Sequence, residues 1–350
     1  FPSHTSELPP LFLGPYELKE RIGLGGMAEV YIAEKRSHGG LVKRVALKRM
    51  RPEFVGDAAF RKLFLREAAL SLSLAHPNLV QVFDFGDSDG ELYLAMEYIE
   101  GADFLSLCHD GLDPALLAAI AHGAAQALSY LHERAEGAVL HRDLSPTNIL
   151  IGVHGQVKLV DVGIARPLCE SVSTAPVGTW RYAAPEQRAQ VPLSPACDLY
   201  SLARVILEGA DSGQRGDWGS AGQTAAWLAE LAKRPGFAGL CETLGPCLAY
   251  EPEKRPQTAR ELLPALSKLQ LPDAESCHTA LIAKVAQARR HQSAGQSPSP
   301  PRRTRPMPLT PAALTPATRP ATTRADGDVN PSCVRGWLKP MVIGVLVLAL

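Results

Sequence analysis

The feature that most constrains this chain is the polar segment His141–Asn148, with the sequence HRDLSPTN. Apolar residues flank it at 139–140 and 149–151, which predicts a polar loop held between two short buried segments. Asp143 can accept a proton from an attacking hydroxyl group, and Asn148 can offer an amide oxygen to a metal ion. The segment therefore predicts a catalytic loop.

A second polar residue of the same kind stands at the end of the next apolar run. Asp161 follows Leu159 and Val160 and precedes Val162 and Gly163. Carboxylate and amide oxygens are the ligands that Mg²⁺ prefers, and this ion often accompanies phosphate groups. We therefore expect Asp161 to share a metal ion with the amide-bearing residue of the catalytic loop.

Composition narrows the class of protein. The chain has 350 residues and is 46% hydrophobic, enough for a large bilobal domain or two compact ones. Its formal net charge is zero, so no nucleic-acid partner is indicated. The seven cysteines form no Cys-x-x-Cys pair, which argues against a zinc site or a disulfide framework and favours a reducing compartment.

The N-terminal part predicts a glycine-rich hairpin. Residues 16–22 alternate like a strand, and residues 23–31 predict a turn followed by a returning strand. Glycines let the backbone come close to a ligand, and exposed N–H groups can cover phosphates. A hairpin that binds nothing is the alternative. The strand–turn–strand order argues against a dinucleotide-binding fold, which would place a helix after the glycines.

Five ordered motifs together resemble the protein kinase superfamily, specifically the eukaryotic-like Ser/Thr kinases of bacteria, over about residues 16–269. They are G-x-G-x-x-G-x-V at Gly23–Val30, V-A-I-K ending at Lys48, H-R-D-L-x-x-x-N at His141–Asn148, the D-x-G at Asp161–Gly163, and G-T-x-x-Y-x-A-P-E at Gly178–Glu186.

The resemblance implies an α+β, bilobal protein kinase fold, with a small, mainly antiparallel β N-lobe that carries one key helix and a larger, mainly helical C-lobe. We expect an extension at 1–13, the N-lobe with its hinge at 14–100, the C-lobe at 101–270, a Pro/Ser/Thr/Arg-rich linker at 271–336 and an apolar end at 337–350. Asp113 is expected to cap the C-lobe's core helix, with Pro114 in its first turn.

The resemblance further implies an ATP-dependent Ser/Thr protein kinase that autophosphorylates and uses Mg²⁺, with Mn²⁺ as an alternative ion. Lys48, paired with Glu67, would meet the α and β phosphates, Asp143 would act on the substrate hydroxyl, and Asn148 and Asp161 would hold the metal. The expected nucleotide-binding residues are Ile22, Gly23, Leu24, Gly25, Gly26, Met27, Ala28, Val30, Ala46, Lys48, Met96, Glu97, Ile99 and Leu150.

Two other sets of residues follow from the resemblance. Arg142 beside the catalytic aspartate suggests regulation by phosphate on the activation segment, because phosphoserine and phosphothreonine bring charge that arginine binds well. The candidate phosphosites are Ser171, Ser173, Thr174 and Thr179. In the structural set, Asp198 would brace the catalytic loop, and Arg255 would pair with Glu186.

The chain departs from the family pattern at several positions. Ser145 stands where Ser/Thr kinases carry a lysine that touches the γ phosphate, which removes one positive charge. Ala28 replaces a loop glycine, Val162 replaces the phenylalanine of D-F-G, and Ala203 replaces a helix glycine. Two alternatives therefore remain: a pseudokinase that acts as an ATP-binding or scaffolding module, and a small-molecule phosphotransferase, which should lack the G-T-x-x-Y-x-A-P-E segment.

The C-terminal part predicts no further folded domain. Residues 292–332 are rich in Pro, Ser, Thr, Ala and Arg, which is typical of an extended linker. Residues 341–350 are apolar or Gly, and ten helical residues reach about 15 Å, half of a bilayer core. We expect the start of a single-pass span that anchors a cytoplasmic kinase domain to the inner membrane; a short hydrophobic tail is the alternative. The remaining expected partners are protein substrates and a second copy for autophosphorylation in trans.

Overall fold

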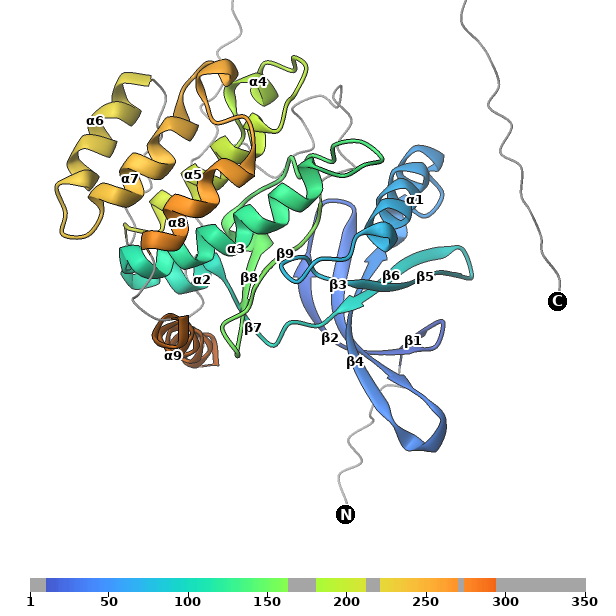
Figure 1. Ribbon diagram of the computed structural model, residues 1–350. Helices are drawn as coiled ribbons and strands as arrows, with labels where there is room; N and C mark the ends of the chain where they lie inside the picture. Colours follow the sequence, from blue (N-terminus) through green and yellow to red (C-terminus); the bar gives the residue numbers. More distant parts are fainter. Residues whose placement is uncertain (1–10, 163–180, 212–220, 270–273, 294–350) are drawn as a thin grey trace, which may run out of the picture. The chain divides into compact units, whose positions relative to one another are not determined.

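The computed structural model describes residues 11–162, 181–211, 221–269 and 274–293. All of them belong to one compact unit that extends to Pro300. Within it, strands gather in the N-terminal part and helices in the C-terminal part (Figure 1). This division confirms the expected bilobal fold, with the lobes joined between residues 97 and 101.

The N-lobe is a six-stranded antiparallel sheet in the order β1-β2-β3-β4-β6-β5. Its strands are β1 (Leu11–Leu13), β2 (Tyr16–Leu24), β3 (Ala28–Arg36), β4 (Val42–Met50), β5 (Val82–Ser88) and β6 (Glu91–Glu97). Helix α1 (Ala58–Ser73) packs against β5 and β6, with the Asp57 carboxylate accepting N–H groups at its start (Figure 1). The sheet and α1 together form the frame that presents Lys48 and Glu67.

The C-lobe contains a small sheet in the order β7-β8-β9 and a group of helices. The strands are β7 (Gly101–Asp103), β8 (Ile149–Gly152) and β9 (Val157–Leu159). The helices are α2 (Phe104–Leu107), α3 (Pro114–His132), α4 (Pro185–Arg188), α5 (Ala196–Glu208), α6 (Ala221–Ala232), α7 (Ala238–Leu244), α8 (Leu263–Leu269) and α9 (Ala274–Ser293).

Helices α3 and α5 form the centre of the C-lobe. The Asp113 side chain caps α3 by accepting the Ala115 N–H, and Pro114 stands in the first turn, as the sequence predicts. Leu117, Ile120 and Leu128 of α3 are fully buried. Burial of small and branched apolar side chains on nearly every face of α3 makes it the rigid support for the catalytic loop that follows it.

Helix α9 differs from the linker that the sequence predicts from residue 271. Residues 274–293 are helical and pack against β7, β8, α2 and α3, so the folded lobe extends at least to Ser293. The composition bias that suggested a linker begins only near the end of this helix. None of the helices that the structure describes is long and apolar enough to cross a membrane. The expected linker beyond 293 and the apolar residues 341–350 lie outside the described residues.

Candidate active site

The two metal-ligand candidates lie at the small C-lobe sheet. Asn148 immediately precedes β8, and Asp161 follows β9 by two residues. The Val160 N–H donates to the Asn148 carbonyl at 3.1 Å, which fixes the two metal-ligand candidates on adjacent segments. The sheet therefore acts as the platform of the site.

Lys48 links the two lobes. Its Nζ lies 2.6 Å from Glu67 Oε1 on α1 and 2.8 Å from Asp161 Oδ1. The predicted Lys48–Glu67 ion pair is thus confirmed. The contact with Asp161 brings together residues 113 positions apart in the sequence.

Opposite charges keep Lys48 and Asp161 ionised although burial opposes it. Burial alone would lower the pKa of Lys48, but the carboxylates of Asp161 and Glu67 outweigh burial and raise that pKa above 10.5. Burial likewise opposes ionisation of Asp161, but Lys48 holds the pKa of its carboxyl group below 3.8. At neutral pH Lys48 is therefore a cation and Asp161 an anion.

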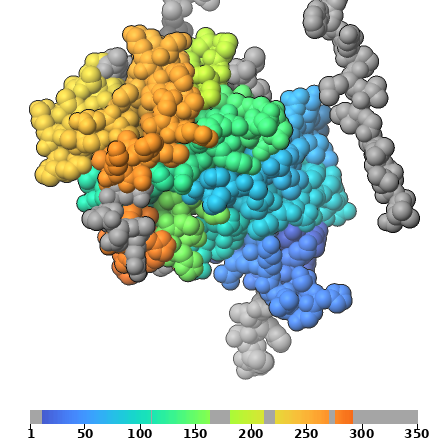
Figure 2. All heavy atoms as spheres, in the orientation of Figure 1, coloured from blue at the N-terminus to red at the C-terminus, as the bar shows by residue number. Residues whose placement is uncertain are grey.

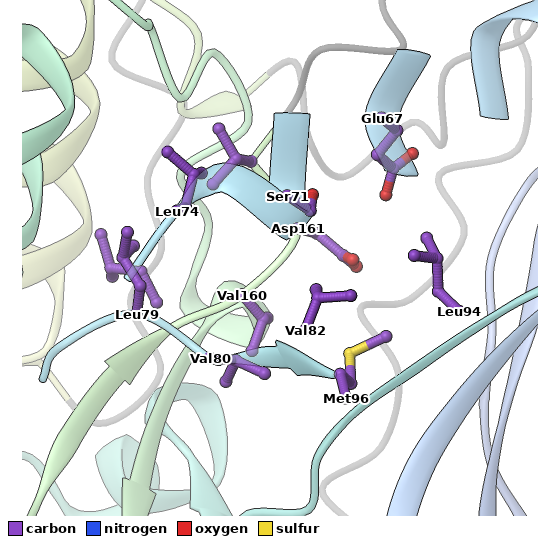
Figure 3. Close-up of a pocket in the computed structure, with 12 residues that line it drawn as sticks. Glu67, Ser71, Leu74, Leu79, Val80, Val82, Leu94, Met96, Val160 and Asp161 are labelled. Carbon is purple, nitrogen blue, oxygen red and sulfur yellow. The ribbon is translucent and has the colours of Figure 1, made fainter. Parts of the chain in front are cut away.

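A small cavity of about 30 Å³ adjoins the cluster. Figure 3 shows Glu67 and Asp161 at its edge, with Met96 and Val82 among its apolar lining. A cavity of this size holds one or two water molecules and no nucleotide. A larger ligand would have to bind outside this cavity, and the Asp161 side chain is 40% exposed on the outside.

The catalytic loop is held by its own hydrogen bonds. The Asn148 side-chain N–H₂ donates to the Asp143 carbonyl at 2.7 Å and lies 3.4 Å from Asp143 Oδ2. This arrangement orients the Asn148 amide, so that its carbonyl oxygen points away from Asp143. Ser145 is buried, and its hydroxyl lies 3.0 Å from the hydroxyl of Thr147. The loop therefore accommodates serine at the lysine position by pairing it locally.

Asp198 holds the backbone of the catalytic loop, as the sequence predicts. Its two carboxylate oxygens accept the backbone N–H groups of His141 and Arg142, each at 2.8 Å. His132 Nε2 lies 2.8 Å from the same carboxylate, a contact that sequence reasoning missed. A single histidine near the end of a long apolar helix gives no signal of such a role.

His141 also ties the loop to the segment that carries Asp161. Its Nε2 lies 3.1 Å from the Val160 carbonyl and must therefore carry the donated proton. Burial lowers the pKa of His141 below 6.5, and the charges of Asp198 and Asp161 offset this only in part. The imidazole is thus neutral at pH 7.

The glycine-rich turn leaves free space around Gly26. A Cβ atom at Gly26 would meet no atom within 4 Å, and the Gly25 N–H donates to the Ala28 carbonyl at 2.8 Å. Ala28 begins β3 without a left-handed φ, so alanine fits there without backbone strain. Ile22 and Leu24, at the end of β2, are 48% and 61% exposed and are therefore accessible to a ligand.

The remaining nucleotide-binding candidates surround the lobe connection. Ala46 and Met96 are cross-strand neighbours on β4 and β6. Leu150 lies on β8, and Glu97 and Ile99 lie at the connection itself. An unexpected contact is the ion pair of Lys158 Nζ with Glu97 Oε2 at 2.7 Å, which joins the connection to β9.

The oxygen donors present fit Mg²⁺. Asn148 and Asp161 offer an amide and a carboxylate oxygen, and a divalent ion on these two would complete its shell with phosphate and water. Among the residues that the structure describes, no group of three His, Cys, Asp or Glu side chains could form a self-sufficient metal site. This donor set suits a metal that arrives with a phosphate ligand.

The regulatory candidates are only partly described. Ser171, Ser173, Thr174 and Thr179 lie outside the described residues. Arg142 is described: its backbone has φ 62°, and its Nε is buried without a hydrogen-bond partner in the described part of the chain. The phosphate-binding role of Arg142 remains a prediction.

Fold and site together define a bilobal domain of the protein kinase type. The chain belongs to the protein kinase family: the family model described as "Protein kinase domain" matches residues 16–212. This match confirms the family that the ordered motifs predict.

Similar characterised proteins belong to the same family. The serine/threonine-protein kinase PknH of Mycobacterium tuberculosis is 40% identical over 200 residues, 56% of this chain and 31% of that protein. The tyrosine-protein kinase MasK of Myxococcus xanthus is 34% identical over 210 residues, 56% of this chain and 32% of that protein. The chain thus spans about a third of the length of these relatives.

A solved structure supports the fold. The crystal structure of the Mycobacterium tuberculosis PknI kinase domain matches with a TM-score of 0.57 and 28% identity. The match covers 75% of this chain and 100% of that domain.

Proposed function

We propose that this chain is an ATP-dependent protein kinase that transfers the γ-phosphoryl group of ATP to serine or threonine hydroxyls of proteins. The observation that carries the proposal is the position of Lys48 Nζ, 2.6 Å from Glu67 and 2.8 Å from Asp161. This cluster stands beside the Asp143–Asn148 loop. A cation and oxygen ligands in this relation suit a metal-bound triphosphate.

Different residues would bind different parts of ATP and its metal ion. The Gly23–Val30 turn would cover the phosphates with backbone N–H groups, and Lys48 would orient the α and β phosphates while Glu67 fixes its position. Asn148 and Asp161 would hold Mg²⁺, which neutralises charge on the phosphate oxygens. The adenine ring would lie among Ala46, Met96, Leu150 and the lobe connection.

Asp143 acts on the acceptor. Its carboxylate would orient the substrate hydroxyl and accept its proton as the new phosphate ester bond forms and the bond to ADP breaks. The Asn148 side chain holds the Asp143 backbone carbonyl at 2.7 Å, so the carboxylate stands on a fixed loop. Ser145 gives the transition state one positive charge less than the family's lysine would.

The acceptor amino acid follows from the relatives and the motifs. PknH is named a serine/threonine kinase and MasK a tyrosine kinase, so similarity alone leaves both chemistries open. The G-T-x-x-Y-x-A-P-E segment at 178–186 resembles Ser/Thr kinases, and this favours Ser/Thr acceptors. Phosphoamino acid analysis of the labelled product separates the two, and phosphotyrosine alone would contradict the Ser/Thr assignment.

The experiment that tests catalysis compares the full chain with an Asp143→Asn variant, each incubated with labelled ATP and Mg²⁺. Asparagine keeps the size of the side chain but removes the proton acceptor. We expect labelling of the wild type, or of a generic protein substrate, and a loss of about 10²- to 10⁴-fold in the variant. Labelling of neither would support a pseudokinase, and equal labelling of both would contradict the role of Asp143.

The partners beyond ATP and protein substrates stay predictions. Anchoring through residues 341–350 can be tested by membrane fractionation of the full chain beside a variant that lacks these residues. Self-phosphorylation in trans can be tested by mixing active wild type with tagged Asp143→Asn protein. Label on the tagged protein would support a transient homodimer.

A further inference from the structure

Helix α9 presents one buried face to the C-lobe. Cys277, Leu281, Val285 and Ala288 are 4%, 4%, 0% and 5% exposed, and they recur every three or four residues. This spacing places them on one side of the helix. All four belong to the same core cluster as the buried side chains of α3 and β8. The helix is therefore an integral part of the lobe, although the family match ends at residue 212.

The elements under α9 are those that carry the active site. It packs against β7 and β8 (Figure 1), and on the face shown in Figure 2 it lies beside the segment that contains β8. Strand β7 begins two residues after Ile99, and β8 follows Asn148 directly. The lobe connection and a metal-ligand candidate thus both lead into strands that α9 supports.

Two contacts attach α9 to the end of the sheet where β7 begins and β8 ends. Near its start, His278 lies so close to Gly155, in the β8–β9 turn, that a Cβ atom there would stand 2.7 Å from the imidazole Cδ2. Near its end, Arg289 Nη1 lies 2.9 Å from Oε1 of Glu100, which follows Ile99. Eleven helical residues span about 16 Å, which exceeds the roughly 10 Å between the outer two of three strands about 4.8 Å apart.

Glu100 is itself fixed to the sheet. Its backbone carbonyl accepts the Val153 N–H at 2.7 Å, so its position is coupled to the end of β8. The ion pair with Arg289 adds a second point of attachment, from the helix side. A change at α9 would therefore act on the residue next to the expected adenine contact.

We propose that α9 is a brace that positions the lobe connection for nucleotide, and that Arg289 is a positioning residue that acts through Glu100. The proposal rests on the proposed function, because it concerns the ATP site. It goes beyond that function in assigning the nucleotide affinity in part to a helix outside the matched domain.

The charge arm of the test measures the Kd of a fluorescent ATP analogue with Mg²⁺ on the full chain. Arg289→Glu and Glu100→Arg each put like charges together and should raise Kd by about threefold. The double variant Arg289→Glu/Glu100→Arg restores opposite charges and should return Kd to the wild-type value. Arg290→Glu, an exposed neighbour on the same helix, is the matched control and should leave Kd unchanged.

The packing arm separates positioning from general stability. Leu281→Ala removes a buried side chain of α9, and Leu240→Ala removes one of equal size from α7, where Leu240 is 1% exposed. Both should lower Tm. Only Leu281→Ala should raise Kd, by about threefold or more, when binding is measured well below both melting temperatures.

The outcomes are distinguishable. If the wild type binds the analogue and Arg289→Glu and Leu281→Ala bind it no more weakly than their controls, the brace is overturned and the proposed function stands. If the wild type binds no nucleotide, the proposed function fails and takes the brace with it. Raised Kd in both variants, with rescue in the double variant, supports the brace.

Discussion

Two ion-pair systems in this protein each join a basic side chain to carboxylates, but they differ in burial and in the partners of the cation. Arg255 holds Glu186 through two contacts, of 2.6 and 2.9 Å, and donates as well to three backbone carbonyls. Its side chain is 0% exposed, and that of Glu186 is 4% exposed. Lys48 instead shares one ammonium group between Glu67 and Asp161, on an open side of the lobe junction.

The two systems differ in whether a charged group stays accessible to a ligand. Every donor direction of Arg255 ends on protein, so the pair can only hold the C-lobe together. Asp161 is 40% exposed and has φ 54°, a left-handed conformation that costs a non-glycine residue about 1 kcal/mol or more. Exposure and local strain at a charged residue are features of a group that can exchange its partner for a ligand.

The largest effect on stability should come from the closed pair. Arg255→Ala leaves the Glu186 carboxylate buried without a partner, and we expect a loss of about 3–5 kcal/mol in the free energy of unfolding. Chemical denaturation measures it. Lys254→Ala is the control, because Lys254 is 69% exposed in a surface pair and should change stability by less than about 1 kcal/mol. Equal losses in the two variants would break the comparison.

A change in the cluster of Lys48, Glu67 and Asp161 should affect activity more than stability. Lys48→Met should reduce phosphoryl transfer by about 10²-fold or more, since a preorganised charge at the reacting group is lost. It should cost less stability than Arg255→Ala, because one of the two remaining carboxylates, that of Asp161, is 40% exposed, whereas Arg255→Ala also removes the donors to three backbone carbonyls. A steady-state assay and a melting curve on the same protein check both parts. A Lys48→Met variant that keeps its activity but loses as much stability as Arg255→Ala would reverse the assignments of the two pairs.

As pH falls, the stabilising contribution of buried His141 should be lost before Lys48 and Asp161 change their charge. The pKa of Asp161 lies below 3.8 and that of Lys48 above 10.5, so both stay charged between pH 5 and 8. The pKa of buried His141 is lowered, so the unfolded chain takes up its proton first as pH falls through 6.5.

Stability should therefore be steady above pH 6.5 and fall below it, by at most about 1.4 kcal/mol per pH unit for one histidine. His76 and His122 have pKa values lowered by burial in the same direction, so the total slope has more than one source. Denaturation at pH 7.5 and 5.5 should show a shallower slope in His141→Asn than in the wild type. An unchanged slope would mean that His141 takes no part.

The smallest effect concerns Ser145. Ser145→Lys restores a positive charge beside Asp143 and should raise kcat by a few-fold at most, since Mg²⁺ and Lys48 already neutralise much of the phosphate charge. Ser145→Ala is the control and should leave kcat near the wild-type value. A strong loss in Ser145→Ala would show instead that the hydroxyl contact with Thr147, at 3.0 Å, sets the loop geometry.

Residues in ordered motifs were predictable, and isolated ones were not. The Lys48–Glu67 pair, the Asp198 brace and the Glu186–Arg255 pair all follow from the resemblance, because each partner stands in a motif of its own. The α3 start follows from local chemistry alone, since a cap followed by proline is a direct signal.

The missed features depend on tertiary packing. His132 and the Lys158–Glu97 pair sit in an apolar helix and an apolar strand, where their partners are 66 and 61 residues away. Helix α9 carries further apolar residues, such as Ile282 and Ala283, beside the buried stripe of Cys277, Leu281, Val285 and Ala288, so its sequence does not show which face packs against the lobe. Such contacts leave no local pattern.

The claim at the centre of this account is that Asp161 and Lys48 grip a magnesium-bound triphosphate. The most direct test measures ATP affinity of the full chain with Mg²⁺ and with EDTA, beside Asp161→Asn and Asp143→Asn. Wild type and Asp143→Asn should bind ATP more tightly with Mg²⁺, and Asp161→Asn should lose that difference. The same Mg²⁺ dependence in Asp161→Asn as in the wild type would contradict the claim.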